Sequence, residues 1–408
     1  LPSPPLGVAF SSDNRALIVT STEFLRYEPA GGALAVVATI EELETNSLPA
    51  KPASLPAAIT AASVAASRDG ERIYGLTDTI YFRFDRYPQR LTLIGYVSDP
   101  EMGPRAVSVS RDGSYFAAGW AVFDQRGSLT AQFAGASGAL AVGGHAIDSD
   151  RGLIYAQVPK QKGEAPVLMV ADADNLTVRE RLRLPENLAG KAVLSADGST
   201  MYAISASGLA VLPVGAWQTQ KRLTSTAESV LFQASFCQRA TATQEIFLVD
   251  AAGGAIDYAI SGGGPGLTVA PASGVTPAAV QLRFDPEALA NRQGTVEYTL
   301  TLTSSQAVNL PLQVRVLLNV RQADQRGTVF RVPGDLVDVL ADAARNRFYV
   351  LRQDANQVLV YNASDYSLIR TLRTGATPTQ MAFTLDGRYL VVGNDNSQIA
   401  NVYDLETL

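Results

Sequence analysis

The sequence predicts an all-β protein, a seven-bladed β-propeller with an inserted immunoglobulin-like β-sandwich. Three observations predict this fold. A unit of short alternating strands around an Asp-Gly turn recurs along the chain, its copies lie about 40 to 55 residues apart, and one interruption has a strand pattern of its own. Repeats of roughly 40 to 50 residues with about four short strands each are typical of propeller blades.

The repeat is clearest from Pro378 to Asp404. Its Asp386-Gly387 pair lies between alternating apolar runs, and glycine adopts the positive φ of a tight turn without steric cost. In the first copy Asn14 takes the place of glycine, because asparagine also tolerates positive φ. Seven copies predict seven blades. Their turns fall at Asp13, Asp69, Asp112, Asp150, Asp197, Arg345 and Asp386.

The interruption between the fifth and sixth copies, residues 224–324, predicts a second domain. About seven alternating strands separated by turn signals are typical of an immunoglobulin-like sandwich. The expected strands are Val230–Ala234, Ile246–Asp250, Ile256–Ile260, Leu267–Ala270, Val280–Phe284, Thr295–Thr303 and Leu310–Val320. The predicted domains are therefore blades one to five over 1–223, the sandwich over 224–325, and blades six and seven over 326–408.

The outer strand of blade five has two alternative positions. The run Asp324–Thr328 resembles Asp124–Ser128, which precedes the outer strand of blade three, so Thr328–Val332 is one candidate. The other is Gln218–Leu223. Both place the sandwich at an exposed edge, where insertions are tolerated. The seventh copy ends after three strands, which predicts either an irregular ring closure or a longer natural chain.

Composition limits the functions to consider. The 408 residues are 47% hydrophobic and 18% charged, as in ordinary globular proteins. A net charge of −6 provides no basic surface for nucleic acid, and no apolar run is long enough to span a membrane. The single cysteine, Cys237, excludes an internal disulfide and is expected to be a small buried residue. The Pro-rich start at Leu1 is typical of a processed chain or of an expressed fragment.

Two resemblances refine these expectations. The repeat, best seen from Thr377 to Val392 and in Val402–Asp404, resembles the bacterial YVTN or lactonase-like seven-bladed propellers over about three quarters of the chain. The insert, in Leu267–Pro277 and Gly294–Leu302, is similar to BACON-type bacterial immunoglobulin-like domains. The resemblances imply a bacterial protein that is extracellular, periplasmic or on the cell surface, and a binding role.

Propeller loops that surround the central channel form the usual binding face. A mixed polar ring there would suit a sugar or a peptide, so a carbohydrate or protein partner is expected. For the individual residues, the favoured interpretation is that they are solvated loop residues and turn formers. The predicted ligand-binding residues are Arg105, Trp120, His145, Lys191, Asp335, Asp354, Gln380 and Asp395.

His145 is the only histidine, so it is the only candidate base for a Ser-His-Asp relay, and a His-rich metal site is excluded. A lactonase-like hydrolase would use His145, Arg105 and Asp335 at the channel mouth. The resemblance to lactonase-like propellers implies several polar channel residues, histidine among them, and one histidine argues against that activity. A structural histidine is favoured.

Two acidic clusters, Asp148–Asp150 and Asp172–Asn175, offer oxygens that suit calcium, but both coincide with predicted turns and lack the spacing of a calcium loop. No metal or cofactor is therefore predicted. The favoured function is a non-catalytic binding or scaffold protein of the bacterial envelope or exterior. The alternative is a lactonase-like propeller hydrolase. The oligomeric state is left open.

Overall fold

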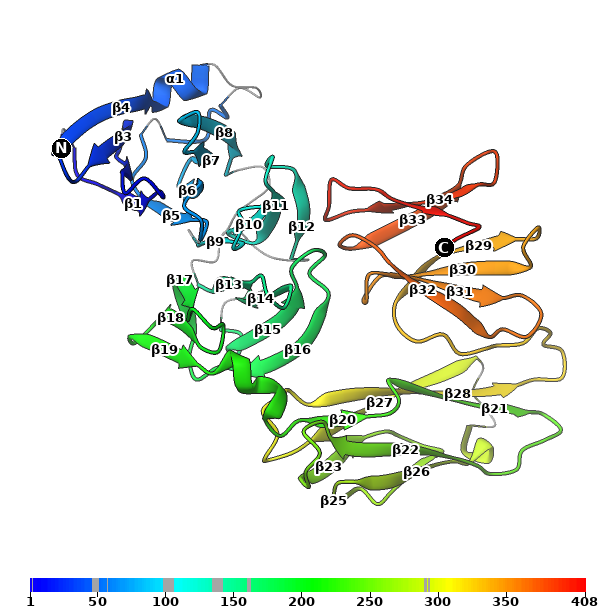
Figure 1. Cartoon of the computed structure of the whole chain (residues 1–408). Coiled ribbons are helices and arrows are strands. Elements are labelled where there is room, and N and C mark those ends of the chain that lie inside the picture. Colours follow the sequence, from blue (N-terminus) through cyan, green and yellow to red (C-terminus); the bar gives the residue numbers. More distant parts are fainter. Residues whose placement is uncertain are drawn as a thin grey trace. The chain divides into compact units, whose positions relative to one another are not determined.

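The computed structural model describes residues 1, 3–45, 51–56, 58–97, 106–133, 142–159, 163–289, 292 and 294–408. The chain forms two compact units, and Figure 1 shows their strands. The first contains Leu1–Val214 and Asp335–Leu408, and the second contains Gly215–Gly334.

The described residues of the first unit form seven antiparallel sheets, which we label blades 1 to 7. In each, neighbouring strands follow one another along the chain. Blade 1 has β1 (Gly7–Phe10), β2 (Ala16–Val19), β3 (Glu23–Glu28) and β4 (Ala33–Thr39), blade 2 has β5 (Ala62–Ala66), β6 (Arg72–Thr77), β7 (Ile80–Asp85) and β8 (Arg90–Tyr96), and blade 3 has β9 (Val107–Val109), β10 (Tyr115–Ala118), β11 (Ala121–Asp124) and β12 (Leu129–Gln132). Blade 4 has β13 (Gly144–Asp148), β14 (Leu153–Gln157), β15 (Val167–Asp172) and β16 (Val178–Arg183), and blade 5 has β17 (Leu188–Leu194), β18 (Met201–Ser205) and β19 (Leu209–Leu212). Blade 6 has β29 (Leu336–Asp342), β30 (Arg347–Arg352), β31 (Gln357–Asn362) and β32 (Leu368–Arg373), and blade 7 has β33 (Pro378–Phe383), β34 (Tyr389–Asn394) and β35 (Asn401–Asp404).

The repeated turns have the predicted backbone conformation. Positive φ occurs at the turn residue of every copy, namely Asn14, Gly70, Gly113, Gly152, Gly198, Asn346 and Gly387. In blade 5 the Asp197 carboxylate accepts hydrogen bonds from the Ser195 hydroxyl (2.6 Å) and the Ser199 amide (3.0 Å). These bonds lower the pKa of Asp197 to about 2. The aspartate therefore holds the turn through its carboxylate, as in an Asx turn.

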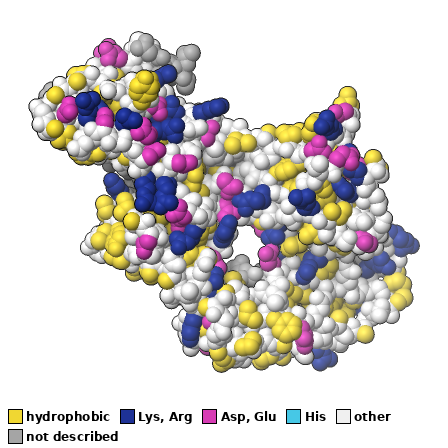
Figure 2. Space-filling model, viewed as in Figure 1, with side chains coloured by type: hydrophobic (Ala, Val, Ile, Leu, Met, Phe, Trp, Pro, Cys, Tyr) yellow, Lys and Arg dark blue, Asp and Glu magenta, His cyan; other side chains and the backbone are white. Residues whose placement is uncertain are grey.

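Consecutive blades pack on one another within two groups, blades 1 to 5 and blades 6 and 7. The first strands of blades 1 to 5 contact one another in succession, and β29 contacts β33 in the same way. Between blades 2 and 3 the rings of Tyr74 and Phe116 stack with centroids 4.2 Å apart. On the face shown in Figure 2, acidic and basic side chains are interspersed. The first unit is thus an all-β, propeller-like body.

Replacing Gly70 with alanine is expected to lower the free energy of unfolding by more than about 1 kcal/mol. Its φ is +68°, and an added Cβ would lie 2.4 Å from the backbone nitrogen of Ser12 in blade 1. Gly152→Ala is the matched control, because its φ is +65° but no atom lies within 4 Å of the added Cβ. Urea unfolding of both variants separates the effect of the contact with Ser12 from the effect of the positive φ. Equal losses would show that the contact with Ser12 contributes nothing.

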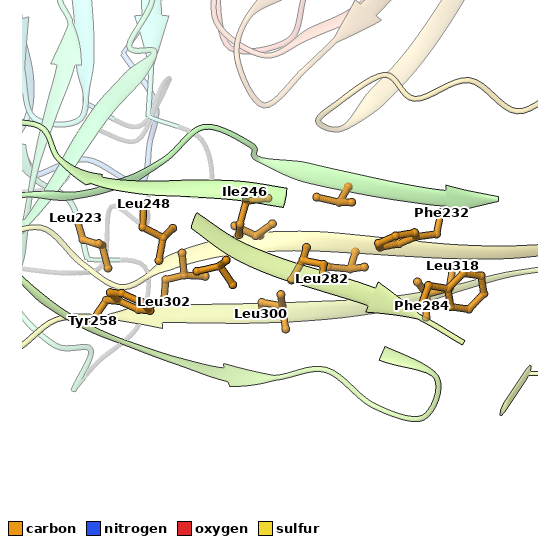
Figure 3. Close-up of a cluster of buried hydrophobic side chains, with 14 of the residues drawn as sticks. Leu223, Phe232, Ile246, Leu248, Tyr258, Leu282, Phe284, Leu300, Leu302 and Leu318 are labelled. Carbon is orange, nitrogen blue, oxygen red and sulfur yellow. The ribbon is translucent and has the colours of Figure 1, made fainter. Parts of the chain in front are cut away.

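The second unit is a sandwich of two sheets (Figure 3). One sheet has the order β20 (Leu223–Ser225), β22 (Ala242–Asp250), β26 (Ala278–Phe284) and β24 (Leu267–Ala270), and the other has β21 (Ser229–Ser235), β28 (Leu312–Arg321), β27 (Thr295–Thr303), β23 (Asp257–Gly262) and β25 (Ser273–Val275). Two 3-10 helices, η1 (Val214–Thr219) and η2 (Pro286–Leu289), accompany them. Alternate residues of both sheets form one apolar core, which includes Phe232, Ile246, Leu282, Phe284, Leu300 and Leu318.

Three sequence expectations need correction. Gln218–Leu223 is not an outer strand of blade 5, because it spans the end of η1 and the start of β20. Thr328–Val332 contains no strand either, so blade 5 has three strands. Cys237 is exposed rather than buried.

A short helix, α1 (Ile40–Thr45), follows β4 in blade 1. A capping box explains it: the Glu42 amide donates to the Thr39 hydroxyl (3.1 Å), and the Thr39 amide donates to the Glu42 carboxylate (2.9 Å). The Thr-x-x-Glu pattern was therefore readable in the sequence. Among the described residues, no helix combines the length and the apolar character needed to cross a bilayer.

Candidate functional site

The predicted ring residues lie in very different surroundings. Arg105 falls outside the described residues. Trp120 and His145 are buried. The remaining five, Lys191, Asp335, Asp354, Gln380 and Asp395, are exposed. The Asp335 amide donates to Asp354 Oδ1 at 2.8 Å, which brings these two residues together between the start of blade 6 and its β30–β31 turn.

His145 lies in β13 and connects blades 3 and 4. Its Nδ1 is 2.9 Å from the Ser108 hydroxyl of β9, and the same hydroxyl donates to the His145 carbonyl oxygen at 2.7 Å. A serine hydroxyl has one proton to donate. Because the carbonyl takes that proton, Nδ1 must be protonated and must donate to the Ser108 oxygen.

This geometry opposes a catalytic dyad. A general base has to accept the proton of its nucleophile, whereas here the imidazole donates to the serine. Burial lowers the pKa of His145 to about 4, although the backbone of Gly119 and Ala106 opposes that shift. The imidazole is therefore neutral at neutral pH. Ser108 and His145 form a structural link between two inner strands.

Trp120 is part of the core rather than a ligand platform. It is fully buried in the turn between β10 and β11 and packs in the cluster that contains Ile147 and Val158 of blade 4. Gly143 lies against the indole, since a Cβ there would be 2.5 Å from the Trp120 Cη2 atom. Access of a ligand to this ring would require the core to open.

A charged cleft of about 640 Å³ lies between blades 3 and 4. Blade 3 supplies Tyr115, Val122 and two polar residues, the strands and turns of blade 4 supply most of the charges, and Arg373 and Ile399 come from blades 6 and 7. The lining residues are Tyr115, Val122, Asp124, Thr130, Ser149, Arg151, Gly152, Asp172, Ala173, Asp174, Arg179, Arg373 and Ile399. This cleft is a candidate site for binding.

Ion pairs organise the charges of the cleft. The buried Asp172 carboxylate pairs with Arg179 of β16 and with Arg373 of β32, the latter at 2.8 Å. Arg373 also contacts Asp174 at 2.9 Å, and Arg151 pairs with Asp148 at 2.6 Å. Both signs of charge are present, so the lining suits a ligand that offers hydroxyl groups or charges of both signs.

The two acidic clusters considered for calcium have other partners. Arginines pair with the Asp148 and Asp172 carboxylates. The Asn175 amide nitrogen donates to the Thr374 carbonyl oxygen at 2.9 Å, and its oxygen accepts from the Thr177 amide at 3.1 Å. Arginine beside these oxygens disfavours a cation there. Within the described ranges, no group of three or more His, Cys, Asp or Glu side chains is placed to hold a metal ion.

The arginines of the cleft were not predicted from the sequence. Arg151 lies in a repeated turn and Arg179 in an alternating strand, so each looked like an ordinary exposed residue. The missing information was the ion pair of Arg179 with Asp172, which depends on how β16 pairs with β15.

Comparisons with known proteins place the chain in no family. No protein family and no curated protein matches the sequence. Among solved structures, a mitotic checkpoint complex aligns at 10% identity over 98% of this chain and 86% of the other, with a TM-score of 0.33. Hydrazine synthase of Kuenenia stuttgartiensis aligns at 11% identity over 84% and 94%, with a TM-score of 0.29. A GH5 xyloglucanase of Bacteroides ovatus aligns at 17% identity over 24% and 19%, with a TM-score of 0.19.

Proposed function

We propose that the protein is a non-catalytic binding or scaffold protein of the bacterial envelope or exterior. It contacts a glycan or protein partner through its blade loops, its charged cleft and its sandwich. The observation that carries this proposal is the environment of His145. A lactonase-like hydrolase would need this histidine as its base, and the imidazole is buried and donates to Ser108.

The assignment of the two units to particular fold families is part of the same proposal. The seven sheets are the blades of a seven-bladed propeller of the YVTN or lactonase-like kind, and the sandwich is an immunoglobulin-like module of the BACON kind. The recurrent turns support the first assignment. The second is supported by two facing sheets whose inward-facing residues form one core, as in immunoglobulin-like folds.

The cleft is the proposed contact site of unit 1. Arg179 is half exposed, so its guanidinium is accessible to a ligand, while the Asp172 beside it is buried and holds it in place. Planar guanidinium and carboxylate groups can each make two hydrogen bonds to neighbouring hydroxyls of a sugar or to a peptide. The aromatic ring of Tyr115 lies in the same lining.

Two binding screens test this site. The purified protein is applied to a glycan array and panned against a displayed peptide library, and each ligand found is titrated calorimetrically. Arg179→Ala is expected to weaken binding at least tenfold. Arg111→Ala is the matched control, because Arg111 pairs with the exposed Asp150 outside the cleft. A ligand that both variants bind equally would exclude the cleft as its site, and two empty screens would contradict the proposed function.

A further inference from the structure

The outer strand of blade 4 carries a row of arginines at alternate positions. β16 pairs with β15 on one side and ends the sheet (Figure 1). Arg179, Arg181 and Arg183 are all exposed, whereas the residues between them are half-buried. The register shifts at Arg179, so Arg181 and Arg183 form the regular part of the row. Side chains two positions apart on a strand point to the same face, about 6.6 Å from each other.

The charges of this regular part are not neutralised within the described chain. The guanidinium groups of Arg181 and Arg183 have no hydrogen-bond or ion-pair partner there. Arg179, in contrast, pairs with the buried Asp172. Two like charges held on one face of a strand repel each other, although the whole chain has a net charge of −6. The edge of blade 4 is therefore a local positive site that an acidic partner would neutralise.

The same two residues direct their backbone polar groups to the open edge. The Leu184 amide donates to the Pro166 carbonyl oxygen, so these two residues form a hydrogen-bonded pair of the ladder. Such pairs alternate in an antiparallel ladder with pairs whose N–H and C=O groups point away from each other. Arg181 and Arg183 lie three residues and one residue before Leu184, so they belong to the second kind. No described backbone group bonds to them from the open side.

The combination distinguishes β16 from the other described outer strands. Strands β4 and β12 contain no charged residue, and β8 has a single arginine, Arg90. In β32, Arg373 pairs with two aspartates and Arg370 donates to the Thr407 carbonyl oxygen. Charges on an edge strand prevent uncontrolled pairing with other chains. A row of one sign still admits a strand of the opposite sign.

We propose that the open edge of β16 binds an extended acidic segment of a protein partner by strand addition, with glutamate or aspartate at alternate positions. The segment pairs antiparallel with β16, as the strands within blade 4 do. The residues opposite Arg181 and Arg183 then exchange N–H···O bonds with them and carry their carboxylates on the same face as the guanidinium groups. A glycan has no such backbone. The inference rests on the proposed binding function and narrows its partner.

Synthetic peptides test both parts of this recognition. A fluorescent peptide in which glutamate alternates with valine is titrated with the protein and followed by anisotropy. A peptide of the same composition with its glutamates side by side is expected to bind at least tenfold more weakly. Methylation of the glutamate backbone nitrogens should abolish binding, because these N–H groups face the edge. Methylation of the valine nitrogens, which face away, should leave binding unchanged.

Charge reversal in the protein identifies the contacting residues. The double variant Arg181→Glu and Arg183→Glu is expected to lose the glutamate peptide and to bind a peptide with lysine in place of glutamate. Arg90→Glu is the matched control, because Arg90 is an exposed arginine on the outer strand of blade 2. It is expected to leave the affinity for the glutamate peptide unchanged.

Four results would overturn the assignment. The alternating peptide could fail to bind, in which case the arginines only protect the edge. The two glutamate orders could bind equally well, or the two methylated peptides could, and either result would show charge attraction without strand addition. Finally, a partner from the screens described above could bind the double variant as tightly as the unmodified chain. That last result would leave the proposed function standing and exclude only the edge of β16.

Discussion

Replacing Phe284 with alanine is expected to lower the free energy of unfolding of the sandwich by about 3 to 5 kcal/mol, because a large cavity would replace the ring. The side chain is fully buried in β26, and its ring centroid lies 5.6 Å from that of Phe232 on the facing sheet (Figure 3). Calorimetry should show the sandwich melting at a lower temperature.

Phe247→Ala is the control for this experiment. Phe247 belongs to the same sandwich but is about half exposed on β22, so its loss is expected to cost less than about 1 kcal/mol. Hydrogen exchange then locates the effect. Because each unit has its own core, protection in the blades should stay unchanged. Equal loss of protection in blades 1 to 5 would contradict the division into two units.

The second large effect concerns pH. The pKa of His145 is about 4 in the folded chain and about 6.5 when exposed, so the unfolded chain binds more protons between these values. The contribution of neutral His145 to the free energy of unfolding is therefore fully present above about pH 6.5, and it falls as the pH drops towards 4. Between pH 7 and pH 4.5 the expected loss from this group is about 2.5 kcal/mol. Urea unfolding at the two pH values measures it.

His145→Asn should remove this part of the pH dependence, since asparagine keeps a donor for Ser108 and does not titrate. Asp197→Asn is the control. The pKa of Asp197 is lowered to about 2, so its contribution is present above about pH 3.8 and is lost only below that value. The loss between pH 7 and pH 4.5 should thus persist in the aspartate variant. If it also persists in His145→Asn, the buried neutral histidine is not its cause.

Local features of the fold were predictable from the sequence, and long-range ones were not. The turn at Gly387 has the expected positive φ because a tight turn between two strands is decided by adjacent residues. The absence of a fourth strand in blade 5 was not predicted. Thr328–Val332 is rich in β-branched and aromatic residues, but strand formation requires a partner edge, which a local pattern does not specify.

The same difference between local and long-range features explains which parts of the candidate site were predictable. His145 was recognised as the only histidine, but its partner Ser108 lies in another blade, so neither the direction of the hydrogen bond nor the low pKa followed from the sequence. Asp335 and Asp354 were expected in one ring and do contact each other. The cleft was missed because its walls come from segments far apart in the sequence, such as those of Arg179 and Arg373.

Turnover of lactones is the measurement that tests the central claim most directly. The purified protein is titrated with calcium in a calorimeter, before and after chelation, and is then assayed for hydrolysis of a panel of sugar lactones beside His145→Asn. A non-catalytic binding protein predicts no saturable calcium heat and no hydrolysis above the uncatalysed rate. Calcium-dependent hydrolysis by the unmodified chain that is lost in His145→Asn would contradict the account and would assign the chemistry to this histidine.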